Sequence, residues 1–288
     1  MKVEGLGERG LLERIKPYLA AQAGNDDAAL IPDGAGFLVA SSDMFVEGVH
    51  FDLGWMSPED VGRRSMALAL GDLAAKGAAP AWGLSSVAIP KGWSAESVEL
   101  IYKGMAEVAR VTGLSIAGGD MSATAGSAVI SLTVVGRVDQ RPLARSEVQP
   151  GWVVAVTGPL GGAAVALRQR RAFRLEPRID EGRRLNDAGL CCGDVSDGLV
   201  RELEKFAEMS GAGCVLQAAE VPMAEGATPE DALTSGEEAE LVCAGPEEAI
   251  RKAGLNAVGT LTRDQAVRVV GADGRPLRLT LSGYDHFA

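Results

Sequence analysis

Seven aspartates stand in five short patches, most of them beside glycine or serine. The patches are Asn25-Asp26-Asp27, Ser41-Ser42-Asp43, Gly71-Asp72, Gly118-Gly119-Asp120 and Asp194-Val195-Ser196-Asp197-Gly198. Any one patch is typical of a solvated turn, because Asp and Gly are ordinary turn residues. The set, however, supplies only oxygen ligands, which Mg²⁺ prefers, and Mg²⁺ usually joins carboxylates to substrate phosphates. The five patches together predict a multi-metal phosphate site built from several loops.

Asp72 is the most informative of these aspartates. It lies on an expected helix that begins at Ser57-Pro58, a capping hydroxyl followed by proline, and runs to about Lys76. Asp72 is eleven residues past Val61, almost three whole turns, so it lies near the inward-facing stripe. A buried carboxylate is costly unless it is paired or bound to metal. This placement favours a metal ligand over a solvated acid at the end of a helix.

Three further motifs contain residues suited to phosphate or nucleotide binding, and His50 stands near one of the aspartate patches. The patch from Asp194 to Leu199 opens a helix, whose first turn can be capped by these side chains and can also receive a phosphate. His50 stands seven residues past Asp43, within a loop's reach of a phosphate bound there. The glycine-rich junction at residues 158–162 is interpreted as structural. The match to GxGxxG at residues 5–10 is attributed to chance, because no strand can precede it.

Composition limits the class of protein. With 288 residues, 47% of them apolar, the chain can form one large domain or two ordinary ones. A net charge of −11 argues against nucleic acid or an anionic membrane as partner. Four cysteines without CxxC spacing indicate reduced thiols and a cytoplasmic protein, and no apolar run is long enough to span a membrane. Gly-Lys never occurs, so a P-loop is excluded.

The expected elements alternate in an α/β (α+β) pattern. Helices are expected over residues 11–22, 57–76, 94–112, 162–171 and 197–210. Strands are expected over residues 37–40, 83–89, 114–117, 128–138 and 153–157. The chain becomes rich in Arg and Pro over residues 139–151, which predicts a boundary there. We expect an N-terminal domain over residues 1–140 that binds ATP and Mg²⁺ and dimerises, and a C-terminal α/β domain over residues 141–288.

In this order, the patches resemble those of the thiamine-monophosphate kinase family. That family belongs with aminoimidazole ribonucleotide synthetase, selenophosphate synthetase and a hydrogenase-maturation protein. The resemblance runs nearly end to end and is carried by Asp26-Asp27-Ala28-Ala29-Leu30, Ser41-Ser42-Asp43, Gly48-Val49-His50-Phe51, residues 70–80, Gly118-Gly119-Asp120, Leu143-Ala144-Arg145-Ser146, Asp194-Val195-Ser196-Asp197-Gly198-Leu199, residues 236–241 and residues 283–287.

The resemblance implies direct transfer of the γ-phosphoryl group of ATP to thiamine monophosphate, with no catalytic side chain. It implies that several Mg²⁺ ions are held by Asp27, Ser41, Ser42, Asp43, Asp72, Asp120, Asp194 and Asp197. It implies that ATP is contacted by Tyr102, Gly119, Asp120, Arg145 and Ser196. It implies that thiamine monophosphate is contacted by His50, Glu237 and Tyr284. The implied assembly is a homodimer in which two N-terminal sheets form a shared barrel.

Two departures from the family pattern bear on substrate choice: Asn25 replaces a glycine, and Ala239 replaces a tyrosine. We therefore expect Tyr284 and Phe287, near the end of the sequence, to supply aromatic surface. Among related activities, selenophosphate synthetase needs a reactive cysteine near the N-terminus, whereas no cysteine precedes Cys191. The alternatives left open are a ligase like aminoimidazole ribonucleotide synthetase and a nucleotide-binding regulator without turnover.

Overall fold

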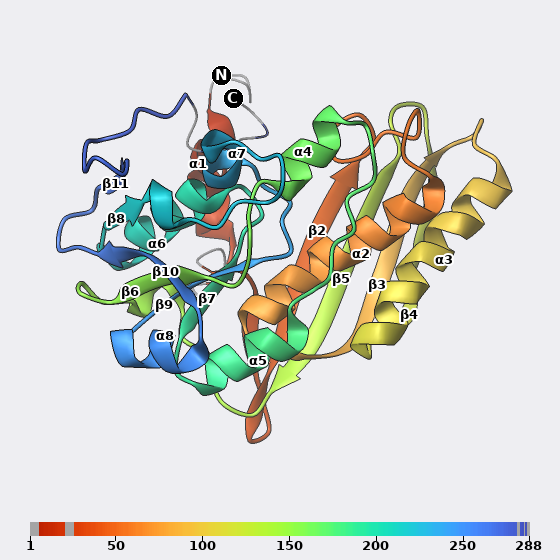
Figure 1. The fold of residues 1–288 in the computed structure, drawn as a ribbon. Helices are drawn as coiled ribbons and strands as arrows, with labels where there is room; N and C mark the ends of the chain where they lie inside the picture. Colours follow the sequence, from red (N-terminus) through yellow and green to blue (C-terminus); the bar gives the residue numbers. More distant parts are fainter. Residues whose placement is uncertain (1–5, 21–25, 281–282, 285, 287–288) are drawn as a thin grey trace.

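Five strands form the first sheet of the computed structural model, which describes residues 6–20, 26–280, 283–284 and 286 (Figure 1). The strands are β1 (Ala29–Asp33), β2 (Gly36–Val46), β3 (Ala79–Pro90), β4 (Ser115–Thr124) and β5 (Val129–Val138). Their order is β1-β2-β5-β3-β4, and only β3 and β4 run parallel. Helices α2 (Pro58–Ala75) and α3 (Ala95–Thr112) cover one face.

The second sheet has the order β11-β8-β10-β6-β9-β7 in the described part of the chain. Its strands are β6 (Val153–Val156), β7 (Cys191–Asp194), β8 (Cys214–Gln217), β9 (Leu241–Gly245), β10 (Asn256–Leu261) and β11 (Val267–Val270). The remaining helices are α1 (Gly7–Ile15), α4 (Gly162–Arg168), α5 (Ile179–Asp187), α6 (Leu199–Ser210), α7 (Pro229–Thr234) and α8 (Glu247–Ala253). Short 3₁₀ turns lie at Lys16–Tyr18, Arg145–Glu147 and Ala218–Glu220.

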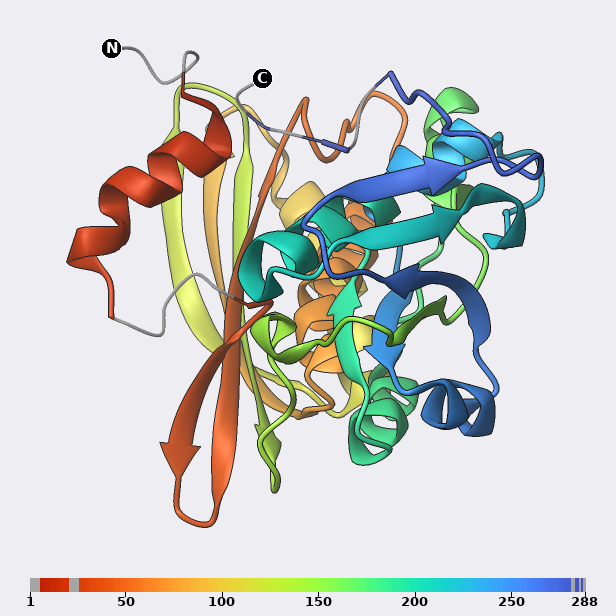
Figure 2. The ribbon, with the colours of Figure 1, turned by 90° about the vertical axis from the view of Figure 1, so that its left-hand side faces the viewer.

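Helix α2 lies between the two sheets (Figure 2). It contacts α3, β2 and β5 on one side and α5, β7 and β9 on the other. One apolar cluster joins Leu73 of α2 to Leu185 and Leu241 from the second half. Gly62 permits the close approach to α3, because a Cβ there would collide with the Ile101 carbonyl. Since α2 is covered on both sides, a carboxylate near its inward stripe must lie at the junction of the two halves.

The structure confirms most of the expected elements and corrects some. The helices expected over residues 57–76 and 94–112 agree with α2 and α3 to within one residue at each end. The helix expected over residues 11–22 is wrong in its bounds: α1 begins at Gly7 and gives way to a 3₁₀ turn around Pro17, which lacks a backbone donor. Residues 21 and 22 of that expected helix lie outside the described part, as do Asn25 and Phe287.

The strand expected over residues 114–117 was too short, because β4 continues to Thr124. Gly118-Gly119-Asp120 therefore lies inside an edge strand and not in a loop. An edge strand with both faces largely exposed shows no alternation of apolar residues, so its length could not be inferred from periodicity. Helix α5 was missed because its sequence is mostly polar. None of the described helices has the length and apolarity that crossing a bilayer demands.

Candidate functional site

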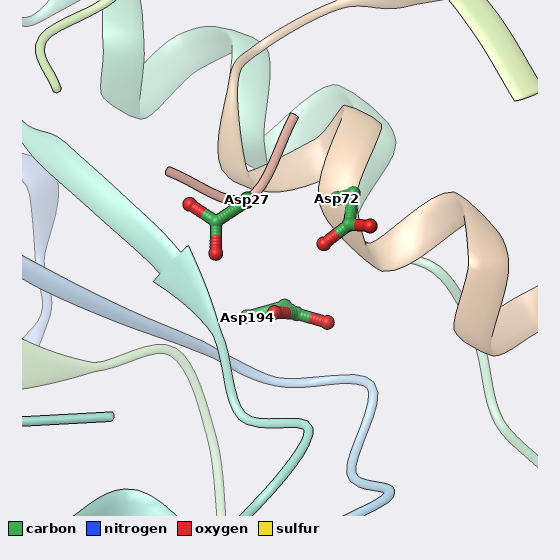
Figure 3. A group of neighbouring side chains, drawn as sticks. All are labelled: Asp27, Asp72 and Asp194. Carbon is green, nitrogen blue, oxygen red and sulfur yellow. The ribbon is translucent and has the colours of Figure 1, made fainter. Parts of the chain in front are cut away.

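Asp27, Asp72 and Asp194 meet at the junction of the two halves (Figure 3). They come from the loop before β1, from α2 and from the end of β7. One carboxylate oxygen of each lies within 4.8 Å of those of the other two. Three acids from segments far apart in the sequence thus form one cluster of oxygen ligands, the donor type that Mg²⁺ prefers.

The charges around this carboxylate cluster are unevenly balanced. Burial, followed by repulsion from neighbouring carboxylates, raises the pKa of Asp72 and of Asp194. Burial acts on Asp27 as well, but Arg145 and Lys76 outweigh it and hold the pKa of Asp27 well below its usual range. On the side of the cluster formed by Asp72 and Asp194, the ionised carboxylates are therefore disfavoured unless a further counter-charge is present.

A divalent cation fits this cluster on two further observations. Asp27 Oδ2 is buried and accepts no hydrogen bond of good geometry among the described residues. Gly71 leaves room beside Asp194, because a Cβ at this position would lie 2.8 Å from Asp194 Oδ2. A side chain at Gly71 would displace the carboxylate that faces Asp72. The chemistry, charge and space of the site all suit a cation held by oxygen.

Ser41, Ser42 and Asp43 are consecutive residues of β2, so the side chains of Ser41 and Asp43 point to one face of the sheet and that of Ser42 points to the other. The Ser41 hydroxyl donates a hydrogen bond to Asp72 Oδ2, and its oxygen lies 3.4 Å from the Asp27 carbonyl oxygen. Burial and then Asp197 raise the pKa of Asp43 to about 6. The Ser42 hydroxyl lies on the other face, 3.0 Å from the Thr133 hydroxyl. The structure therefore brings Ser41 and Asp43 to the cluster and leaves the Ser42 hydroxyl away from it.

A network of ion pairs borders the cluster beside α6. Arg145 is 4% exposed and pairs with Asp27 and with Glu202, the latter at 2.7 Å. Lys205 Nζ lies 2.7 Å from Asp197 Oδ2 and 2.6 Å from Glu202 Oε1. Ser196 Oγ is 3.4 Å from Glu202 Oε1. Arg145 and Ser196, both expected to contact ATP, thus bond to acidic side chains here.

The other residues expected to contact ATP line an open groove between α3 and β4. The groove has a volume of about 630 Å³ and includes Tyr102, Gly119 and Asp120. Tyr102 accepts a hydrogen bond from Ser85 at 3.4 Å. Gly119 is required by its surroundings, because a side chain there would collide with the Ser85 carbonyl. The structure therefore brings Tyr102, Gly119 and Asp120 together, and Arg145 and Ser196 do not line this groove.

The three residues expected to contact thiamine monophosphate lie in one region, where His286 lies between the rings of His50 and Tyr284 and the charge of Glu237 acts on His50. The ring of His50 lies 5.0 Å from that of His286, which lies 4.9 Å from the ring of Tyr284. Glu237 forms an ion pair with Arg64, and its charge acts on His50. Glu237 also has a φ of 59°, a left-handed conformation that is uncommon for a non-glycine residue.

Sequence reasoning missed four charged residues of the site. They are Arg64, Lys76, Glu202 and Lys205. Two of them carried a usable signal, because Arg64 and Lys76 lie eight residues before and four residues after Asp72 on the same helix face. Glu202 and Lys205 gave no comparable signal, since charges on a helix such as α6 are ordinarily solvated.

The N-terminal half of the chain defines its class. Residues 25–138 match the family model for the N-terminal domain of AIR synthase related proteins. The hydrogenase-maturation protein HypE, in complex with HypF, shares the fold with a TM-score of 0.77 at 19% identity, over 94% of this chain and 99% of that chain. Residues 25–138 thus match a domain of the AIR-synthase-related type, and the neighbour at 19% identity shows that the fold is shared along most of the chain.

Longer matches identify the family within this class. The chain is 32% identical to the thiamine-monophosphate kinase of Methanopyrus kandleri over 86% of each chain. It is 34% identical to that of Bacillus subtilis over 64% of this chain and 63% of that protein. A solved structure described as AaThiL complexed with AMPPCP and TMP has a TM-score of 0.89 at 27% identity, over 99% of each chain. The chain belongs to the thiamine-monophosphate kinase family and is an enzyme of this kind.

Substituting Asp43 tests whether the cluster is strained without metal. Because the pKa of Asp43 rises from 3.8 to about 6 in the folded state, the folded protein binds this proton more tightly than the unfolded chain does. Asp43 should therefore destabilise the metal-free fold progressively as pH rises through that window, with the full effect above it. In chelator, Asp43→Asn should melt above the wild type near neutral pH, and the difference should shrink as pH falls through the window.

The exposed Asp139 provides the control, since Asp139→Asn should leave the melting temperature unchanged at each pH. Asp43→Asn should also lose turnover by orders of magnitude. An Asp43→Asn protein that melts below the wild type at every pH, yet turns over normally, would show that this acid has a structural role only.

Proposed function

We propose that this protein transfers the γ-phosphoryl group of ATP to thiamine monophosphate and forms thiamine diphosphate. An oxygen of the thiamine phosphate attacks the γ-phosphorus, the bond to the β–γ bridging oxygen breaks, and ADP leaves. The observation that carries the proposal is that the loop after Asp194 connects the carboxylate cluster to the residues expected to contact thiamine monophosphate. The Glu237 backbone N–H donates to the Ser196 carbonyl at 2.8 Å, and the Tyr284 backbone N–H donates to the Asp197 carbonyl at 3.1 Å. The proposal is supported by the family and by the neighbour described as complexed with AMPPCP and TMP.

In this proposal the chain holds the cations and both substrates. When bound, several Mg²⁺ ions would neutralise charge on the phosphoryl groups, which is the main requirement of such a transfer. The residues proposed to hold them are Asp27, Ser41, Asp43, Asp72, Asp194 and Asp197 at the junction and Asp120 on β4. Ser42 would take part only through its backbone, because its hydroxyl lies on the other face of the sheet. Of the residues proposed to contact ATP, Tyr102, Gly119 and Asp120 line the open groove. Arg145 and Ser196 would reach ATP from the α6 side.

His50 is suited to donate a hydrogen bond to the substrate phosphate. Its Nδ1 accepts the backbone N–H of Val46 at 3.0 Å, so in the neutral ring the proton resides on Nε2. Burial lowers the pKa of His50, although the charge of Glu237 opposes that shift. A neutral imidazole that points Nε2–H at a phosphate binds it without removing its proton. No general base is needed, because the attacking phosphate is already ionised.

An assay of the two acceptors tests the reaction. With ATP and Mg²⁺, the protein should form thiamine diphosphate from thiamine monophosphate and should leave free thiamine unchanged, because a hydroxyl acceptor would need a base. Excess chelator should abolish the reaction. Comparable rates with the two acceptors would refute the assignment. Binding of ATP without turnover would favour the regulator, and ATP-dependent ring closure of an aminoimidazole precursor would favour the ligase.

Tyr284 is proposed to contribute an aromatic surface for the thiamine body. Its side chain is half exposed and packs edge-on against His286, which leaves ring surface free for a ligand. Tyr284→Ala should raise the apparent KM for thiamine monophosphate roughly tenfold, as loss of about 1–2 kcal/mol of stacking and cation–π contact predicts. Tyr284→Phe should stay near the wild type, and the KM for ATP should barely change.

A different pattern would assign Tyr284 another role. The Tyr284 backbone N–H donates to the Asp197 carbonyl at 3.1 Å, so this backbone hydrogen bond also holds Tyr284 against the loop before α6. If Tyr284→Ala raises the apparent KM of both substrates equally and lowers the melting temperature, the ring stabilises the fold and does not contact thiamine.

We further propose a homodimer formed through the first sheet. The face opposite α2 carries exposed apolar side chains on β1, β2 and β3: Ile31, Met44, Trp82 and Leu84 are 40–59% exposed. An apolar surface of this kind on a sheet is typical of a protein interface. Leu84→Asp should convert the dimer to a monomer in light scattering, whereas Val111→Asp, on exposed α3, should not. A wild-type protein that is monomeric at all concentrations would contradict the proposal.

A further inference from the structure

Lys76 is a buried cation that the proposed reaction does not use. Its side chain is 0% exposed, an uncommon state for lysine. Its Nζ lies 2.5 Å from Asp26 Oδ1, 2.9 Å from Asp27 Oδ2 and 3.1 Å from the Cys192 carbonyl oxygen. The contact with the Cys192 carbonyl is a hydrogen bond, and the contacts with Asp26 and Asp27 are ion pairs. Its burial is therefore compensated by partners on every side.

The three partners connect the segments that carry the carboxylate cluster. Lys76 caps the C-terminus of α2, one turn after Asp72. Asp26 and Asp27 belong to the loop before β1, and Cys192 lies in β7 two residues before Asp194. A single ammonium thus links the loop of Asp27 to the strand of Asp194 and extends from the helix of Asp72. Arg145 also pairs with Asp27 but is bonded on its other side to Glu202, so it cannot replace this link.

We propose that Lys76 is a built-in cation that positions the carboxylate cluster, assembling Asp27, Asp72 and Asp194 before any divalent ion binds. The inference rests on the proposed function only in taking these three aspartates as a cation site. Without the ammonium, Asp26 would lose its closest cation and would remain a buried, uncompensated carboxylate beside Asp27. A divalent cation would then have to supply that charge, so the fold itself would come to depend on Mg²⁺.

Thermal unfolding of Lys76→Met tests this role without substrate. In chelator, the variant should melt roughly 10 °C below the wild type, the shift expected when a buried ion pair loses one partner in a chain of this size. Excess MgCl₂ should raise the melting temperature of the variant by clearly more than it raises that of the wild type, because the ion takes the place of the ammonium.

Asn186 provides a matched structural control. Its Nδ2 donates to the Ala75 carbonyl at 3.0 Å, so it fastens the same end of α2 to the second half but touches no carboxylate of the cluster. Asn186→Ala should lower the melting temperature in chelator, yet its increase on adding MgCl₂ should equal that of the wild type. An equal increase in Lys76→Met as well would overturn the proposal and leave Lys76 with a structural role only.

A second variant covers the case in which Lys76→Met does not fold. Asp26→Asn/Lys76→Met removes one carboxylate together with the ammonium, so it should fold and should melt above any Lys76→Met protein in chelator. A double variant no more stable than Lys76→Met would also overturn the proposal. A wild-type protein whose melting temperature does not respond to MgCl₂ would contradict the cation site itself, and thereby both proposals, independently of Lys76.

Discussion

Repulsion between buried carboxylates is the constraint around which this protein is organised. Asp27, Asp72 and Asp194 are held with an oxygen of each within 4.8 Å of the others, at a junction where little water can screen them. Such an arrangement costs free energy in the absence of a counter-charge. The apolar packing of α2 against both halves supplies the stabilisation that keeps the three acids together.

The protein balances this repulsion on one side only. Lys76, Arg145 and Lys205 compensate Asp26, Asp27, Glu202 and part of Asp197. No such cation forms an ion pair with Asp72 or Asp194 within the described residues, and burial followed by neighbouring carboxylates raises the pKa of each. Fixed cations can therefore hold the frame in place, while the uncompensated side remains available for an exchangeable cation that arrives with a phosphate. The acids that pair with lysine or arginine thus differ in role from Asp72 and Asp194, which we propose to bind the exchangeable cation.

Helix α2 also explains how the two substrates can be brought to one place. Arg64, Asp72 and Lys76 follow one another along its inward side at spacings of eight and four residues. Arg64 holds Glu237 near the residues proposed for thiamine monophosphate, and Asp72 faces the second half. The groove proposed for ATP lies on the first sheet beside α3. For an acidic protein of net charge −11, the proposed cations would offset the repulsion of two anionic substrates.

The sequence alone determined the local features of this protein. Helix α2 followed from the Ser57 cap, Pro58 and apolar periodicity, and the inward position of Asp72 followed from counting turns, because these depend on residues close in the chain. The ordered aspartate patches also indicated the family. Only the tertiary structure decided which patches meet. It turned the Ser42 hydroxyl away from Asp43 and placed Asp120 inside an edge strand. It also joined Lys76 to Asp26 and Asp27, and to Cys192, which lies 116 residues further along the sequence. Such contacts depend on strand order and helix packing between distant segments, and a single sequence carries no periodic signal for them.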